Sequence, residues 1–192
     1  MRAWAAAPSP GSNTPAPLGL VADIAASRIG TTFNQYSRSR LRRERLAAYL
    51  ESRRGASLLL VGEAPGYRGA RVSGVPFTSE RQLTGRGPAE ATATIVHHVL
   101  SELGLEERVL LWNVVPTHPG TGTSNRPPTR AEVEAGLAFL VPLAEGRTVV
   151  AVGRIAARAL GVPGLRHPSH GGARDFRAGL IELLDRVLPG PA

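Results

Sequence analysis

Four side chains of different chemistry lie in turns that follow or interrupt apolar runs of this chain. Glu63 belongs to the Gly-Glu-Ala-Pro-Gly turn at 62–66, and Phe77 ends the Gly-Val-Pro-Phe run just downstream. Asn113 and His167 belong to two further Pro-rich turns. A carboxylate, an amide, an imidazole and an aromatic ring, together with the exposed N–H groups of a Gly-Pro turn, are suited to hold a flat, polar heterocycle.

The elements that must position these side chains alternate between strand and helix. Apolar runs bounded by Gly or Pro predict strands at 58–61, 109–115 and 148–152, and a short fourth strand at 164–166. Helices are expected at 39–53, 88–103, 129–144, 154–160 and 175–188. Pro88 suits a first helical position, and Thr129 with Glu132 forms a capping box. This alternation predicts an α/β fold, a three-layer α/β/α sandwich around a four-stranded parallel sheet.

Turns that follow neighbouring parallel strands meet at one edge of the sheet, which is where such sheets bind ligands. We therefore expect Glu63, Phe77, Asn113 and His167 to share one pocket. Each residue alone has an ordinary structural explanation, since a Glu in a turn is usually solvated and a Phe is usually in the core. Their common position at the ends of successive strands is what favours a functional site.

The length of 192 residues fits one domain, predicted at 20–192, after a disordered Pro- and Ala-rich leader at 1–19. The chain has no Cys, which excludes disulfides, Cys-ligated zinc and Cys-ligated iron–sulfur clusters. We expect no metal and no cofactor. No apolar run is long enough to cross a membrane and no signal peptide is evident, so the expectation is a cytoplasmic monomer.

The formal net charge is +8, and every basic residue is Arg because the chain has no Lys. The arginine usage has two explanations, a GC-rich genome or the recognition of phosphate groups. The arginines of the 39–53 helix likewise form either a solvated face or a flank that contacts phosphates. The high charge favours a polyanionic partner.

Four ordered motifs resemble the uracil-DNA glycosylase superfamily. They are the 62–66 turn, Gly-Val-Pro-Phe at 74–77, Trp-Asn-Val-Val at 112–115 and His-Pro-Ser at 167–169. The first motif, and the Asn-Arg-Pro-Pro-Thr run at 125–129, look most like the branch called family four. The resemblance covers about residues 57–188. It implies a monofunctional enzyme of base excision repair that flips uracil, alone or together with other deaminated bases, out of DNA and hydrolyses the bond to the sugar.

The resemblance implies a role for each pocket residue. His167 would donate to uracil O2 as negative charge builds on the leaving base. Asn113 would accept from N3–H and donate to O4, and Phe77 would stack on the ring. Glu63 would bind either the base or a water molecule. The rest of the turn would hold base oxygens or position water through its backbone; these residues are Gly62, Ala64, Pro65 and Gly66.

The sequence departs from the family pattern at three points. Ala64 stands where the best-studied branch has a water-orienting Asp, as it does in family four. Gly66 replaces a Tyr that excludes the methyl group of thymine, so either Tyr67 excludes it or the pocket admits bulkier bases. Family four also carries a Cys-ligated iron–sulfur cluster, which this chain cannot hold. The sequence therefore predicts a cluster-free relative.

The expected partner is uracil-containing DNA, single- or double-stranded. By the resemblance, Ser169 would bind a phosphate beside the flipped base. Arg174 would either fill the gap in the duplex or contact a phosphate, and His170 is the second candidate to fill the gap. Arg71 would belong to a basic rim.

Two other functions fit the sequence. The first is a non-catalytic relative that recognises damaged or flipped bases. The absence of the water-orienting Asp, at the position of Ala64, is consistent with this function. The second is a small α/β protein that binds or hydrolyses nucleotides, against which the Arg excess and the segment after His167 argue. Lyase chemistry through a Lys Schiff base is excluded because the chain has no Lys.

Overall fold

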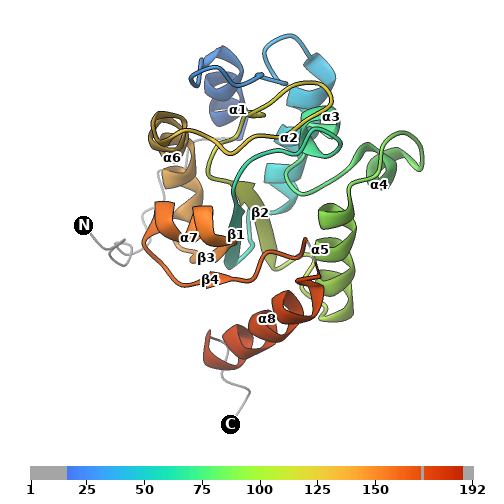
Figure 1. Ribbon diagram of the computed structural model, residues 1–192, viewed down its shortest axis with the longest axis vertical. Coiled ribbons are helices and arrows are strands. Elements are labelled where there is room, and N and C mark those ends of the chain that lie inside the picture. The colour runs from blue at the N-terminus through green and yellow to red at the C-terminus, as the bar shows by residue number, and fades with distance from the viewer. Residues whose placement is uncertain (1–16, 170, 188–192) are drawn as a thin grey trace.

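A sheet of four parallel strands forms the centre of the computed structural model, which describes residues 17–169 and 171–187 (Figure 1). β1 (Leu58–Gly62) lies between β2 (Val109–Asn113) and β3 (Thr148–Val152), and the short β4 (Gly164–Leu165) pairs with β3. The strand order is β2-β1-β3-β4. Because all pairs are parallel, the carboxyl ends of the strands lie at one edge of the sheet.

Helices cover both faces of this sheet. They are α1 (Pro17–Ala26), α2 (Arg40–Ser52), α3 (Ala70–Ser73), α4 (Glu80–Thr84), α5 (Ala91–Glu102), α6 (Arg130–Ala144), α7 (Arg154–Leu160) and α8 (Ala173–Val187). Alternate residues of β1 point to opposite faces. Leu59 and Val61 pack with α1, α2, α6 and α7, and Leu58 and Leu60 pack with α5 and α8. The predicted three-layer α/β/α fold is confirmed.

Most predicted elements are present, with some differences in their ends. β3 and α7 have the predicted bounds, and the capping box of Thr129 and Glu132 begins α6 as expected. The prediction that Pro88 begins a helix was wrong, since α5 begins at Ala91 with Glu90 as its N-cap. β2 ends at Asn113, and α8 begins at Ala173. On α2 (predicted at 39–53), Leu46 and Leu50 are buried, whereas Leu41 is 55% exposed.

Three helices were not predicted from the sequence, namely α1, α3 and α4. α1 begins at Pro17, inside the segment expected to be a leader, and residues 1–16 lie outside the described part of the chain. α3 and α4 are single short helices within the long connection from β1 to α5. Among the helices of the described residues, none is long and apolar enough to cross a membrane.

Candidate functional site

A cavity of about 200 Å³ lies at the carboxyl ends of the central strands. It brings together Glu63, Phe77, Asn113 and His167, which are the four residues expected to share a pocket. Three further residues of the 62–66 turn also line it: Ala64, Pro65 and Gly66. The lining residues not placed in the pocket from the sequence are Ala70, Glu90, Thr92, Pro119, Asn125 and Arg126. Gly62 and Tyr67 are not among the lining residues.

Gly62 is required by the close approach of Phe77 and Asn113. Gly62 and Asn113 are register partners at the ends of β1 and β2. A Cβ atom at Gly62 would overlap the Phe77 ring and lie 3.1 Å from Asn113 Oδ1. Phe77 itself has a φ of 51°, the only positive φ of a non-glycine residue in the described chain. This conformation is costly for a bulky residue, and it holds the ring at the cavity.

The Asn113 side chain is placed to recognise a ligand. The residue ends β2 and is only 4% exposed. Within the described residues, its amide group makes no hydrogen bond, although the group lies at the cavity wall. Buried amides are normally paired. The donor and the acceptor of this amide are therefore available to a ligand in the cavity.

The His167 ring is oriented by Ser169, which follows it in the same turn. The backbone N–H of Ser169 donates to His167 Nδ1 at 3.2 Å, and the Ser169 hydroxyl lies 2.7 Å from the same nitrogen. Because a backbone N–H can only donate, Nδ1 is the accepting nitrogen. The neutral ring therefore carries its hydrogen on Nε2. His167 is thus a donor through Nε2 without needing a positive charge.

Two carboxyl groups line the cavity, those of Glu63 and Glu90. Burial raises the pKa of both groups above the ordinary glutamate value, and neither has a neighbouring charge or hydrogen bond that opposes this effect. Glu90 was not identified from the sequence, because the segment was interpreted as the start of a helix. Among the described residues, no three His, Cys, Asp or Glu side chains form a metal-binding group.

The sequence matches the model of one protein family. The model for the uracil DNA glycosylase superfamily matches residues 51–188, which contain every strand and the whole cavity. The chain belongs to the uracil DNA glycosylase superfamily. Membership in this superfamily implies a DNA substrate.

The solved structures agree with this membership at the level of the fold. SMUG2 of Pedobacter heparinus superposes with a TM-score of 0.69 at 13% sequence identity, over 91% of this chain and 99% of that chain. At so low an identity, the likeness shows the shared fold alone. No curated protein matches the sequence.

The turn at 62–66 and the residue that follows it are held in place by two loop residues. His118 is fully buried, and its ring nitrogens lie 2.7 Å from Pro65 O and 2.8 Å from Thr121 O. Asn125 Oδ1 accepts from the N–H of Tyr67 at 2.9 Å. The burial of His118 and these two contacts make it a structural support of the 62–66 turn. Tyr67 instead packs beside Arg68, whose guanidinium carbon lies 5.4 Å from the ring centre.

The residues predicted to bind DNA lie in different surroundings. Arg174 is exposed in the first turn of α8, and Ser169 holds the His167 ring. His170 lies outside the described residues. Arg71 is half-buried over the ring of Phe33, 4.6 Å from its centre, and Phe33 is 44% exposed. Exposed aromatic rings beside arginines are suited to stack on bases of single strands.

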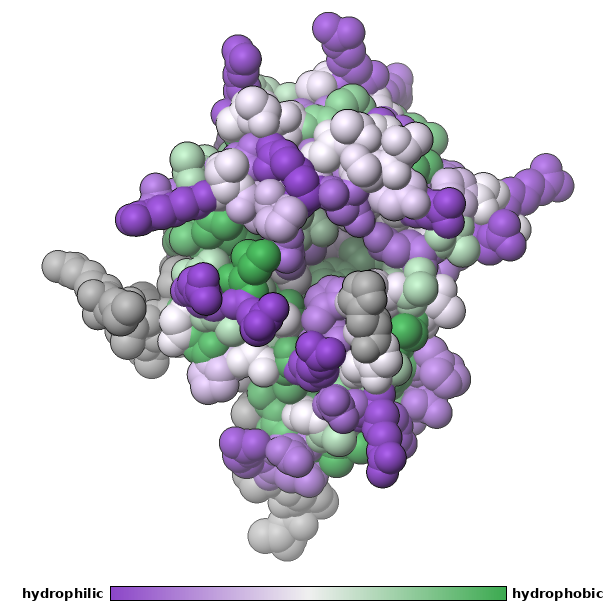
Figure 2. All heavy atoms as spheres, viewed as in Figure 1, coloured by the Kyte–Doolittle hydropathy of each residue, from purple (hydrophilic) through white to green (hydrophobic). Residues whose placement is uncertain are grey.

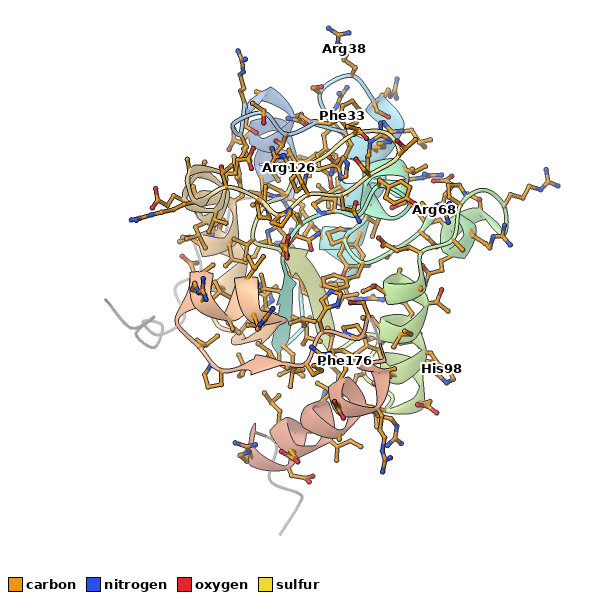
Figure 3. All side chains as sticks on the ribbon, viewed as in Figure 1. Phe33, Arg38, Arg68, His98, Arg126 and Phe176 are labelled. Carbon is orange, nitrogen blue, oxygen red and sulfur yellow. The ribbon has the colours of Figure 1, made fainter. Side chains whose placement is uncertain are left out.

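Three of the basic and aromatic side chains near the cavity share one end of the molecule. Figure 3 shows Phe33, Arg68 and Arg126 on loops beyond the carboxyl ends of the strands, while Phe176 lies at the opposite end, on α8. Figure 2 shows a hollow in the molecular surface whose surroundings include hydrophilic side chains as well as apolar patches. The arrangement provides a polar surface next to the mouth of the cavity, as a polyanionic substrate requires.

The rim of the cavity is anchored by a buried ion pair between Arg126 and Glu132. Both terminal nitrogens of the Arg126 guanidinium donate to the carboxylate, Nη2 at 2.6 Å and Nη1 at 2.7 Å. The backbone N–H groups of Thr31 and Thr129 donate to the same carboxylate at 3.2 and 2.8 Å. The Glu132 side chain is only 2% exposed. The hydrogen bonds of this pair therefore connect three segments: Thr31 between α1 and α2, Arg126 in the loop before α6, and Glu132 in the first turn of α6.

The ion pair predicts a loss of stability in acid. Arg126 lowers the pKa of Glu132 to about 2 from 4.5. This stabilisation, about 3 kcal/mol, is present above pH 4.5 and is lost as the pH falls towards 2. We expect Glu132→Gln to lower the free energy of unfolding by about 2–4 kcal/mol at pH 7, and by much less near pH 2. Urea unfolding at several pH values measures both effects.

Glu134→Gln is the matched control, because Glu134 forms an exposed pair with Arg130 on the same helix. We expect a change below about 0.5 kcal/mol for it. Equal losses in the two variants, or a loss in Glu132→Gln that does not depend on pH, would contradict the account of the ion pair.

Proposed function

We propose that this protein is a monofunctional glycosylase that excises uracil from DNA in base excision repair. The observation that carries the proposal is one cavity with an unpaired buried amide, an imidazole N–H and an aromatic ring. These come from Asn113, His167 and Phe77. The resemblance of the 62–66 motif to family four, in a chain without cysteines, supports a relative of that branch that lacks its iron–sulfur cluster.

Uracil fits these groups edge by edge. Asn113 Oδ1 would accept from N3–H while Nδ2 donates to O4, and Phe77 would stack on the ring. As the bond from N1 to the sugar lengthens, charge moves onto the base, and the Nε2–H of His167 would donate to O2, where that charge gathers. An N–H that is already oriented by Ser169 costs little reorganisation when the charge develops.

The test is excision from oligonucleotides that carry uracil, hypoxanthine, or thymine opposite guanine, in single- and double-stranded form, followed by alkaline cleavage at abasic sites. We expect cleavage at uracil. If none of the substrates is cleaved at high protein concentration while DNA is bound, the non-catalytic alternative is correct and the proposal is not.

Asn113→Asp is expected to change the choice of base. Its carboxylate has no N–H for O4 of uracil, and each unmet polar group costs about 1–3 kcal/mol. We expect excision of uracil to fall about 10- to 100-fold and the preference for uracil over cytosine to fall with it. Single-turnover rates on the two bases measure this. Asn125→Asp is the matched control, since Asn125 uses only its oxygen, towards Tyr67; the same change in preference there would refute the assignment.

A further inference from the structure

The start of helix α5 sends a glutamate side chain into the cavity. Glu90 is the N-cap residue of α5, but its side chain makes no capping hydrogen bond. Ser, Thr, Asp and Asn are the residues that stabilise this position. Glu90 thus contributes little to the helix that it begins, and its carboxyl group lines the cavity instead.

Two glycines of the first motif region make room for this carboxyl group. A Cβ atom on either Gly66 or Gly69 would overlap the carboxylate oxygens of Glu90. The carboxyl group therefore occupies the space that a side chain at either position would fill. A group packed against two backbone segments in this way is restricted in position, as a catalytic group must be.

The Glu90 side chain is partly buried, and its carboxyl has no polar partner that would offset the water it loses. Within the described residues it makes no hydrogen bond and no ion pair, in a chain of net charge +8 whose other glutamates include many paired with arginine. Burial raises its pKa. Burying a carboxyl group without a partner costs stability, and such a cost is typical of functional sites.

We propose that Glu90 is the catalytic base that takes a proton from the attacking water, an inference that rests on the proposed function. The N1–C1′ bond breaks and its electron pair leaves with the base, whose O2 accepts from His167. The water oxygen bonds to C1′, and its proton passes to the Glu90 carboxylate. The proton then goes to solvent and the base anion is protonated, which restores the enzyme.

Glu63 is the competing carboxyl group, and the structure favours Glu90. No glycine cradle encloses the Glu63 side chain, which follows β1 directly and so lies beside the groups assigned to the base. The Glu90 side chain comes from the start of α5 and lies against Gly66 and Gly69. The other titratable groups that line the cavity are Arg126 and His167, and Arg68 and Arg71 flank the two glycines.

The test compares wild type, Glu90→Gln, Glu63→Gln and the control Glu145→Gln, an exposed residue at the end of α6. We expect Glu90→Gln to slow single-turnover excision of uracil by 10²- to 10⁴-fold, the range for a general base. Its affinity for uracil DNA and its melting temperature should not fall, because glutamine has the same shape and no buried charge. Glu63→Gln should slow the reaction less, and Glu145→Gln should not slow it.

The pH profile separates a base from a structural residue. The carboxylate form is active, so the wild-type rate should fall as the pH drops through a pKa above the ordinary glutamate value, and the residual rate of Glu90→Gln should lack this fall. A Glu90→Gln protein that excises uracil at the wild-type rate overturns the inference, as does one that melts at a lower temperature. An inactive wild type refutes the proposed function before any variant is compared.

Discussion

Replacing His167 with Ala is expected to slow uracil excision by about 10²- to 10³-fold. The missing Nε2–H is a preoriented donor to the oxygen on which charge develops, and one such donor typically contributes that factor. Because the charge is small in the ground state, affinity for uracil DNA should change little. Single-turnover rates and binding isotherms on one oligonucleotide measure the two effects separately.

His98→Ala is the matched control, since the His98 side chain is 72% exposed on the outer side of α5 (Figure 3). It should excise uracil at the wild-type rate. Ser169→Ala tests the orientation of the ring: the backbone N–H to Nδ1 remains, so we expect a loss of about tenfold or less. A His167→Ala protein with the wild-type rate would show that the leaving base is stabilised elsewhere.

Gly62→Ala is expected to lower kcat/KM by about 10²-fold although the new side chain is a single methyl group. The methyl group would overlap the Phe77 ring and press on Asn113 Oδ1, 3.1 Å away. A displacement of about 1 Å in a positioned group can cost this factor. Overpacking should also destabilise the fold by about 1–3 kcal/mol. Steady-state kinetics and urea unfolding measure the two losses.

Gly55→Ala is the control for the change in backbone freedom, because a Cβ atom there meets nothing within 4 Å. It should keep both activity and stability. If the overlap with the ring is the cause, Phe77→Leu in the Gly62→Ala background should recover stability without recovering activity. Wild-type kinetics for Gly62→Ala would show that the ring and the amide do not need their present positions.

Local patterns predicted much of the fold. The apolar run at β1 is buried at all five positions, as a central strand between two helical layers must be. Thr129 and Glu132 located the start of α6, because a capping box depends on residues three apart in sequence. The short helices α3 and α4 were missed because they lie within an irregular connection, where tertiary contacts outweigh local propensity.

By itself, the sequence determined the parallel sheet and the pocket of Glu63, Phe77, Asn113 and His167, since parallel strands carry their following turns to one edge. Only the tertiary structure decided how these groups are held. The Glu90 carboxyl group lies in the cavity against the backbones of Gly66 and Gly69, which are 24 and 21 residues earlier in the sequence. His118 reaches Pro65 across 53 residues. Local periodicity does not encode such contacts, because they form only when separate loops pack together at the end of the sheet.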